Sequence, residues 1–290
     1  MTTDATAAGT LQLGGELSVT RMGYGTMRLA GPGVWGPPQD LAEASVILRQ
    51  ALAFGITHVD TADYYGPHTV NELIRTTLAP YPEDLVLVTK VGARRSADRG
   101  WPPALSRDEL ISQVHDNLRN LGVDALDVVN LRLSDAAGGY PVDVPIEAPF
   151  SVLAELREQG LIRHLGVSHV TVEQLEDARK IAPVVCVQNE YNLAHRVGDD
   201  VLDRCTELGI AFVPYFPLGG FSPLQSGVLD ECADAVGATP MQVALAWLLQ
   251  RSPVVAVIPG TSSLAHLKQN IAAGALELPA DVVSRIDAIG

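Results

Sequence analysis

The sequence contains few of the groups that mark several large protein classes. Only three cysteines occur in 290 residues, an odd number without CxxC spacing, which argues against a disulfide framework and a thiolate metal site. No apolar run approaches the ~18 residues of a membrane span. The N-terminal segment MTTDATAAGT also lacks the basic and apolar regions of a secretory signal. We therefore expect a cytoplasmic protein with no membrane partner and no bound metal.

Positive charge is scarce as well. The 20 Lys and Arg residues are outnumbered by 34 Asp and Glu residues, which gives a formal net charge of −14. Nucleic-acid grooves and anionic membrane surfaces need clustered positive charge, so neither is expected as a partner. Lysine is especially rare, since only Lys90, Lys180 and Lys268 occur. Each lysine is therefore a useful place to look for chemistry.

What the chain does have is an alternation of short apolar segments with longer amphipathic ones. The near-continuous apolar runs are typical of strands buried on both faces of a parallel sheet. We expect such strands at residues 21–27, 58–62, 85–92, 126–132, 163–168, 184–191, 210–217 and 254–260. Helical periodicity with capping signals predicts helices at residues 40–54, 106–120, 147–159, 171–181, 198–208 and 240–251.

Eight strands alternating with helices over ~250 residues fit an α/β fold of the (β/α)8 TIM barrel type. The other α/β architecture, a doubly wound sheet, is disfavoured because Arg28 stands where GxGxxG needs its third glycine. The opening segment TLQLGGELSVTRMG predicts an N-terminal β-hairpin with a turn at Gly14 and Gly15. No linker or repeat divides the chain, so we expect one domain over residues 1–290.

Polar residues end the expected strands, which is where a barrel of this type carries its active site. They are Asp60, Lys90, Arg132, Ser168, Gln188, Asn189 and Tyr215, with Tyr65 on the loop after the second strand. Asp60 and Lys90 could form a buried pair that only closes the end of the barrel. With Tyr65 beside them, the three instead suit proton donation, because an ammonium near a phenol lowers the pKa of the phenol.

Six ordered motifs resemble those of the aldo-keto reductases. They are HVDTADYYG at 58–66, VTK at 88–90, GVSH at 166–169, QNEYN at 188–192, YFPLG at 215–219 and IPGTSS at 258–263. The resemblance covers residues 17–287 and implies a (β/α)8 barrel that reduces aldehydes and ketones with NADPH. The segments VVNLR, AGPGV, VGARR and PLGG are similar to a bacterial branch that includes pyridoxal reductases, which makes pyridoxal the expected substrate.

The resemblance implies four catalytic residues. Tyr65 would be the general acid, Lys90 its pKa-lowering neighbour and Asp60 the partner of Lys90. Arg132 stands where the family usually has a histidine. Because arginine keeps its proton at neutral pH, we expect Arg132 to orient the substrate and stabilise an oxyanion, without relaying protons.

The resemblance also implies the residues that hold NADP(H). Ser168 and Gln188 would hold the nicotinamide carboxamide, His169 takes the place of the usual asparagine, and Tyr215 would stack on the nicotinamide ring. Gly260 and His266 replace the usual lysine and arginine of the 2′-phosphate site, so we expect a reduced preference for NADPH over NADH. The expected cofactor-binding set is Gly25, Thr26, Met27, Asp60, Ser168, His169, Gln188, Tyr215, Phe216, Pro217, Leu218, Gly260, Thr261, Ser262, His266, Gln269 and Asn270.

The rim of the substrate pocket is expected on loops after the strands. Its aromatic rings would stack on a planar small-molecule carbonyl substrate. The candidates are Trp35, Tyr64, Arg94, Arg95, Trp101 and Phe221. The sequence leaves open whether the chain is a monomer or a small homo-oligomer. Two other functions also stay open: an NADPH-binding sensor with little turnover, and a lyase that uses Lys90 to form a Schiff base.

Overall fold

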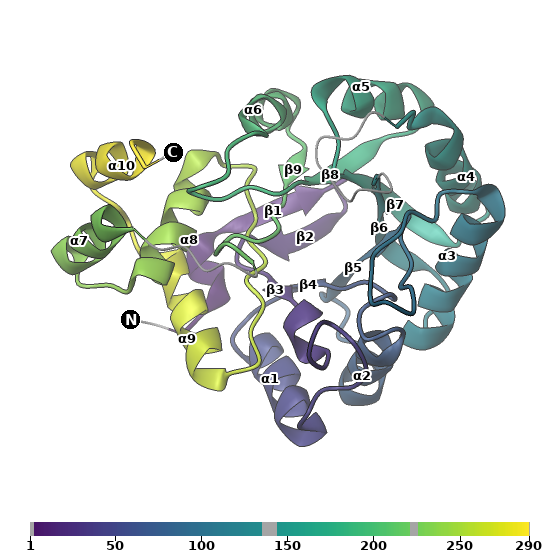
Figure 1. Cartoon of the computed structure of the whole chain (residues 1–290), viewed down its shortest axis with the longest axis horizontal. Coiled ribbons are helices and arrows are strands. Elements are labelled where there is room, and N and C mark those ends of the chain that lie inside the picture. The colour runs from purple at the N-terminus through teal and green to yellow at the C-terminus, as the bar shows by residue number, and fades with distance from the viewer. Residues whose placement is uncertain (1–2, 135–143, 221–225, 290) are drawn as a thin grey trace.

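A parallel sheet of seven strands forms the centre of the molecule (Figure 1). The computed structural model describes residues 3–134, 144–220 and 226–289. The strands lie in sequence order, as expected when each one returns to its neighbour through a helix or loop. They are β3 (Tyr24–Gly25), β4 (His58–Asp60), β5 (Val86–Val91), β6 (Leu126–Arg132), β7 (Ile162–Ser168), β8 (Val184–Gln188) and β9 (Ala211–Phe212).

The segment at residues 254–258 closes this sheet into the predicted barrel. Val255 forms a parallel bridge with Phe212 of β9, and Val257 forms one with Met22, which precedes β3. The backbone N–H of Phe212 donates to Val254 at 2.9 Å, and that of Gly23 donates to Val257 at 2.8 Å. The segment therefore joins both edges of the sheet and takes the place of the eighth strand.

The first strand and the last two are shorter than the sequence predicts. The expected strand at 21–27 is reduced to two residues, that at 210–217 to two residues, and that at 254–260 to isolated bridges. Pro214, Pro217 and Pro259 interrupt the last two segments. A proline has no N–H to donate to a ladder, so regular pairing stops near each of them.

Helices surround the barrel on its outside (Figure 1). They are α1 (Leu41–Ala53), α2 (Thr69–Leu78), α3 (Arg107–Leu121), α4 (Glu147–Glu158), α5 (Val172–Ile181), α6 (Asp199–Leu208), α7 (Gly227–Val236), α8 (Pro240–Arg251), α9 (Leu264–Ala272) and α10 (Ala280–Asp287). Capping boxes support two of the predicted helices, since Ser106 and Glu109 form one at α3 and Thr171 and Gln174 form one at α5. α2, α7, α9 and α10 are not among the helices predicted from the sequence.

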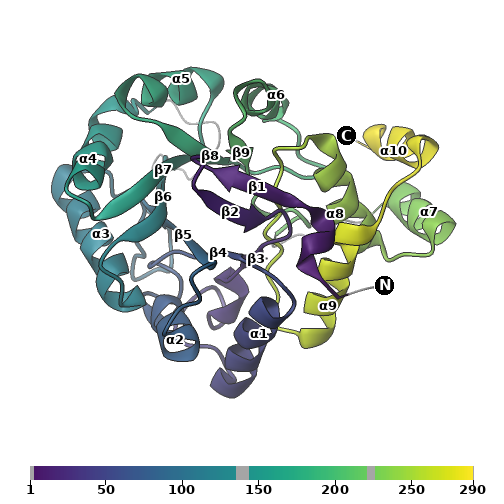
Figure 2. The same ribbon diagram turned by 180° about the vertical axis from the view of Figure 1, so that it is seen from behind.

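An antiparallel hairpin covers one end of the barrel. β1 (Thr10–Leu13) pairs with β2 (Leu17–Thr20), and the turn contains Gly14 and Gly15 with φ of +61° and +78°, as predicted. Leu13 and Val19 are buried in one cluster with barrel residues such as Val128. Figure 2 shows the hairpin lying across the centre of the barrel. The site is therefore built at the opposite end, where the strands finish.

The described helices and polar side chains also bear on membrane crossing and on metal binding. No single described helix is both long and apolar enough to cross a membrane; α7 and α8 reach that length only together, across a bend of 86°. Among the described residues, no group of three or more His, Cys, Asp or Glu side chains could hold a metal ion. Cys186, Cys205 and Cys232 are free and buried.

Candidate active site

A buried ion pair joins the ends of β4 and β5. Lys90 Nζ donates to Asp60 Oδ1 at 2.6 Å and to the backbone carbonyl of Thr61 at 2.9 Å. The side chains of Lys90 and Asp60 are only 6% and 4% exposed. Gln188 Nε2, from the end of β8, donates to the other carboxylate oxygen of Asp60 at 2.8 Å. Asp60 thus holds together three strands that are distant in sequence.

Tyr65 lies next to this pair, on the loop between β4 and α2. Lys90 Nζ is 5.3 Å from the centroid of the Tyr65 ring. Burial raises the pKa of Tyr65 far above its ordinary value, Asp60 raises it further, and Arg132 lowers it. Lys90 is also paired with Asp60 at 2.6 Å, and its expected role as the neighbour that lowers the pKa of the phenol stays a prediction.

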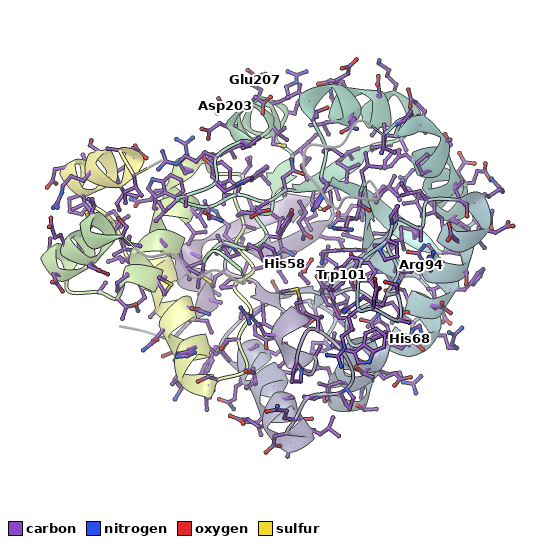
Figure 3. The ribbon with its side chains drawn as sticks, in the orientation of Figure 1. His58, His68, Arg94, Trp101, Asp203 and Glu207 are labelled. Atoms are coloured by element: carbon purple, nitrogen blue, oxygen red, sulfur yellow. The ribbon has the colours of Figure 1, made fainter. Side chains whose placement is uncertain are left out.

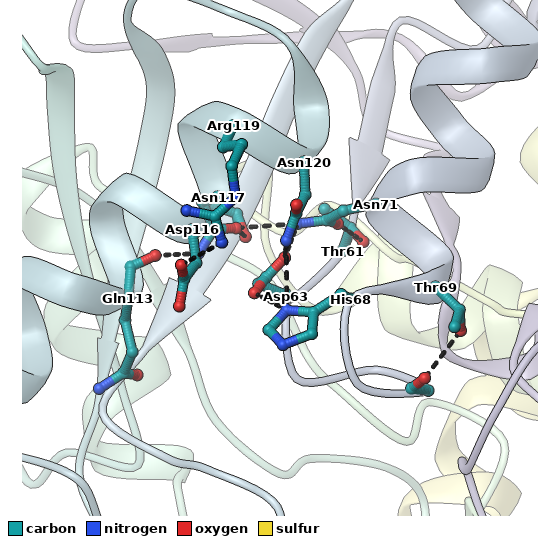
Figure 4. Close-up of polar contacts among 12 residues, drawn as sticks. Thr61, Asp63, His68, Thr69, Asn71, Gln113, Asp116, Asn117, Arg119 and Asn120 are labelled. Carbon is teal, nitrogen blue, oxygen red and sulfur yellow. Dashed lines mark hydrogen bonds and ion pairs between the residues drawn. The ribbon is translucent and has the colours of Figure 1, made fainter.

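A buried network of side chains holds the loop that carries Tyr65 (Figure 4). Asp63, on this loop, accepts hydrogen bonds from Asn71 of α2 at 3.2 Å and from Asn120 of α3 at 2.8 Å. His68 Nδ1 lies 2.7 Å from Asp63 Oδ2, and this hydrogen bond raises the pKa of His68. Thr61 donates to Asn71 at 2.8 Å. The loop is therefore fixed to two helices, which restricts the position of Tyr65.

A pocket of about 320 Å³ opens at this end of the barrel. Its walls combine the polar strand ends, an aromatic group and the loops after β9 and residue 258. Tyr64 and Trp101 form the aromatic part, with ring centroids 5.6 Å apart and nearly perpendicular planes. The lining residues are Gly25, Met27, Arg28, Asp60, Tyr64, Tyr65, Lys90, Trp101, Arg132, Ser168, His169, Gln188, Glu190, Tyr215, Phe216, Pro217, Leu218, Gly220, Ile258, Pro259 and Gly260.

His169 and Tyr215 form a stacked pair on one wall of this pocket. Their ring centroids are 5.1 Å apart with an interplanar angle of 16°, and His169 Nε2 lies 2.6 Å from the Tyr215 hydroxyl. Burial, with the charge of Arg132, lowers the pKa of His169 to about 3. The imidazole is therefore neutral at physiological pH. It fixes the ring of Tyr215, for which the sequence predicts stacking on a nicotinamide.

Comparison with known proteins adds to this geometry. The family model described as the aldo/keto reductase family matches residues 21–290. The chain belongs to the aldo/keto reductase family. The pyridoxine 4-dehydrogenase of Escherichia coli is 58% identical over 275 residues, which cover 95% of this chain and 96% of that protein.

Solved structures of aldo/keto reductases have the same fold. A thermostable aldo-keto reductase in complex with the inhibitor epalrestat is 32% identical, with a TM-score of 0.81 and coverage of 97% of this chain and 99% of that one. An aldo-keto reductase from Klebsiella pneumoniae in complex with NADPH is 25% identical, with a TM-score of 0.76 and coverage of 96% and 94%. The (β/α)8 barrel expected from the sequence is therefore the fold of this family, and the chain is an oxidoreductase.

In this aldo/keto reductase, the pocket brings together most of the residues that the sequence predicts for the site. All four expected catalytic residues line it. From the expected cofactor and substrate sets it collects Gly25, Met27, Ser168, His169, Gln188, Tyr215, Phe216, Pro217, Leu218, Gly260, Tyr64 and Trp101. Their individual roles stay predictions.

Other expected residues of the reductase lie away from this pocket. Thr26, Thr261, Ser262, His266, Gln269, Asn270, Trp35, Arg94 and Arg95 do not line it. Arg94 is 59% exposed and its Nε lies 3.7 Å from Glu109 Oε1, so its side chain turns toward α3. Figure 3 places Trp101 close to the barrel centre and Arg94 nearer the rim. Phe221 lies outside the described residues.

Some lining residues were not predicted from the sequence, among them Arg28, Glu190, Gly220 and Ile258. Arg28 Nη2 donates to the carbonyl of Gly220 at 2.7 Å, which ties the loop after β3 to the loop after β9. Glu190 follows the end of β8 and lines the same pocket. Glu190 lies inside the QNEYN motif, and Arg28 directly follows Met27, so their positions beside predicted residues were the available signal.

Proposed function

We propose that this chain transfers hydride between NADP(H) and a carbonyl carbon, and that pyridoxal, which it converts to pyridoxine, is a substrate. The observation that carries the proposal is the buried Asp60–Lys90 pair beneath Tyr65 in the pocket. The similarity to the E. coli pyridoxine 4-dehydrogenase supports the choice of substrate.

The residues of the pocket fit a nicotinamide cofactor. Gln188 uses its amide nitrogen on Asp60, and its buried Oε1 has no hydrogen-bond partner among the described residues. An orphaned buried acceptor is costly, and the amide N–H of a nicotinamide carboxamide would satisfy it. Ser168 lines the pocket on the neighbouring strand and would share this contact.

The loop at residues 259–270 is expected to bind the 2′-phosphate end of the cofactor. A Cβ added to Gly260 would lie 2.6 Å from the backbone oxygen of Gly25, so this backbone has no space for the lysine found at this position in the family. Thr261, Ser262 and His266 would donate hydrogen bonds to the phosphate instead. This arrangement supports NADP(H) as the cofactor, with a reduced preference over NADH.

Each catalytic side chain has its own role in carbonyl reduction. When bound, NADPH supplies the hydride that reaches the carbonyl carbon. Tyr65 donates its hydroxyl proton to the carbonyl oxygen, so the carbonyl becomes an alcohol and the phenol becomes a phenolate. Arg132 stabilises the developing negative charge on both oxygens, because its charge already lowers the pKa of Tyr65. Lys90 and Asp60 hold the phenol in place, and solvent returns the proton.

The aromatic wall favours a planar substrate. Tyr64, Tyr65 and Trp101 meet edge to face, with centroid distances from 5.4 to 6.3 Å. Such rings offer flat apolar surface with polar tips, which suits a substituted pyridine or benzene ring. This supports a small aromatic aldehyde.

The experiment that tests the proposal follows NADPH oxidation with pyridoxal and with 4-nitrobenzaldehyde. The wild type is expected to reduce both, and Tyr65→Phe is expected to lose about 10²- to 10⁴-fold in kcat, because the proton donor is gone. Tyr81→Phe is the matched control, because the Tyr81 hydroxyl donates to Leu121 outside the pocket. Full activity of Tyr65→Phe would reject the mechanism. Tight NADPH binding without turnover of any aldehyde would support the sensor alternative.

The contacts of Lys90 argue against the lyase alternative. A Schiff base needs a free amine that can reach the substrate. The Lys90 side chain is instead engaged by Asp60 and by the carbonyl of Thr61. Trapping of an aldehyde on Lys90 by borohydride would favour the lyase.

The cysteines bear on the cellular setting of the protein. The three buried free cysteines suit a reducing cytoplasm. We further propose that residues 1–290 form one barrel domain. The chain would act as a monomer or a small homo-oligomer. Light scattering of the purified protein would test the assembly.

A further inference from the structure

Arg132 is the last residue of β6 and lines the pocket together with Tyr65 and Trp101. Its Nη1 atom is buried and has no hydrogen-bond partner among the described residues. The guanidinium forms no ion pair with any residue that the structure describes. A buried, unpartnered donor on a permanent cation is costly, so an acceptor is expected to complete it.

Another partly buried arginine shows what a purely structural guanidinium does in this fold. Arg21 donates to the backbone carbonyls of Val255 at 2.9 Å, Ser252 at 2.8 Å and Ala8 at 3.4 Å. Those contacts tie the barrel wall to its outer layer. Arg132 makes no such contact within the described residues, which separates it from the arginines that serve only packing.

Arg132 has no carboxylate partner among the described residues of the pocket. Lys90 is paired with Asp60 at 2.6 Å and therefore contributes little net charge. His169 is neutral because burial and Arg132 keep its pKa low. The one further carboxylate among the described lining residues is Glu190, which forms no ion pair with Arg132. An anionic group of the substrate would supply the missing charge.

We propose that Arg132 is a specificity residue that binds an ionised hydroxyl next to the reacting carbonyl, so that the enzyme selects ortho-hydroxy aromatic aldehydes. This inference rests on the proposed carbonyl reduction. A guanidinium presents two parallel N–H groups, which match two oxygens on neighbouring carbons. One N–H would face the carbonyl oxygen that gains charge, and the other would face the phenolate. A histidine at this position would offer one donor and no fixed charge.

The same contact also orients the ring. A substrate held through both its aldehyde oxygen and its phenolate oxygen cannot rotate its aldehyde group relative to the ring. Tyr64 and Trp101 enclose the ring from the aromatic wall. The carbonyl carbon is thereby kept in one orientation toward Tyr65. Fixed orientation of this kind raises the rate of the chemical step as well as the affinity. Pyridoxal has this pattern, since its aldehyde is flanked by a ring hydroxyl.

The first experiment compares kcat/KM for 2-hydroxybenzaldehyde, 2-methoxybenzaldehyde and 4-hydroxybenzaldehyde with NADPH. The wild type is expected to prefer the first by at least about tenfold, the effect of one hydrogen bond to a charged group. Arg132→Gln is expected to remove the preference, and Arg132→Lys to retain part of it because the charge remains. Arg285→Gln, which removes an exposed arginine paired with Glu231, is the control and is expected to keep the preference.

The second experiment needs no turnover. Protein loaded with NADP⁺ is mixed with 2-hydroxybenzaldehyde at a pH below the solution pKa of its phenol, and the absorption band of the phenolate is recorded. Wild type and Arg285→Gln are expected to produce this band, and Arg132→Gln is not. Circular dichroism confirms that the variants are folded, and Arg132→Lys serves if Arg132→Gln does not fold.

The outcomes separate this inference from the proposed function. If the wild type reduces neither these aldehydes nor pyridoxal, the proposed function is rejected. If it reduces them without an ortho-hydroxyl preference, or if Arg132→Gln keeps both the preference and the phenolate band, the specificity role of Arg132 is rejected while carbonyl reduction stands.

Discussion

The ammonium of Lys90 lies 2.6 Å from a carboxylate oxygen of Asp60, and both side chains are almost fully buried. Buried charges of this kind are tolerated only when each satisfies the other. The pair also has an outer partner, because Gln188 donates to the second oxygen of Asp60 at 2.8 Å. Structure and chemistry therefore depend on the same three side chains.

Lys90→Met is expected to destabilise the fold and to abolish carbonyl reduction. Removing one member of a buried ion pair leaves the other charge uncompensated and typically costs about 3–5 kcal/mol of unfolding free energy. Urea denaturation measures this loss. The double variant Asp60→Asn/Lys90→Met is expected to recover stability but not activity. If Lys90→Met alone is as stable as the wild type, the stability of the fold does not depend on the Asp60–Lys90 pair.

Arg95 is expected to control the affinity for aromatic substrates through Trp101. Its guanidinium carbon lies 3.9 Å from the Trp101 ring centroid and 5.2 Å from that of Trp35, and it donates to the carbonyl of Val34 at 2.6 Å. Arg95→Met removes these contacts and is expected to raise KM for aromatic aldehydes by about 3- to 30-fold, from ~0.5–2 kcal/mol per cation–π contact.

The kinetic pattern distinguishes this role from a general loss of structure. In Arg95→Met, kcat should change much less than KM, because the buried pair beneath Tyr65 is untouched. Arg107→Met is the control, because Arg107 of α3 forms an exposed ion pair with Glu155 of α4. An unchanged KM in Arg95→Met would show that Trp101 keeps its position without Arg95.

His58 is expected to make the fold sensitive to acid. It lies in the barrel interior (Figure 3), neither ring nitrogen has a partner among the described residues, and burial lowers its pKa to about 4 from an ordinary 6.5. The unfolded chain therefore takes up a proton near pH 6.5 that the folded one resists. The contribution of His58 to the free energy of unfolding is therefore fully present above pH 6.5. As the pH falls toward 4, the free energy of unfolding decreases by about 3 kcal/mol.

Urea denaturation at pH 6.5 and pH 4 measures this effect. His58→Asn removes the titrating group, so the variant should lose about 3 kcal/mol less than the wild type over that interval. His115→Asn, which replaces an exposed histidine on α3, is the matched control. Equal acid losses in His58→Asn and the wild type would contradict the prediction.

His266→Arg is expected to strengthen the preference for NADPH. A guanidinium can donate two hydrogen bonds to a phosphate, so the ratio of kcat/KM for NADPH to that for NADH should rise about tenfold or more. Gly260→Lys should not have this effect, because a Cβ there would lie 2.6 Å from the backbone of Gly25. Initial rates with both cofactors provide the test. A ratio that His266→Arg leaves unchanged would place the 2′-phosphate elsewhere.

Much of the fold could be predicted from local signals. Helices with strong caps, such as α3 with Ser106 and Glu109, were found within one or two residues. α2, which begins at Thr69, was missed, and its N-cap residue His68 has φ of +70° and makes no side-chain cap. α7 and α9 were missed although the side chains of Ser226 and Ser263 cap them. The strand ends also identified the catalytic candidates, because alternation along a barrel strand decides which side chains point inward.

The sequence by itself determined the alternation of strands and helices, the hairpin turn at two glycines and the polar residues that finish the strands. Only the tertiary structure decided which of those residues share a partner. Gln188 and Lys90 share the carboxylate of Asp60, and the charge of Arg132 lowers the pKa of Tyr65. Gly25 and Gly260 meet across the closing seam of the barrel and exclude a lysine. These outcomes depend on distances between strands far apart in the chain, which closure of the barrel sets and no local pattern encodes.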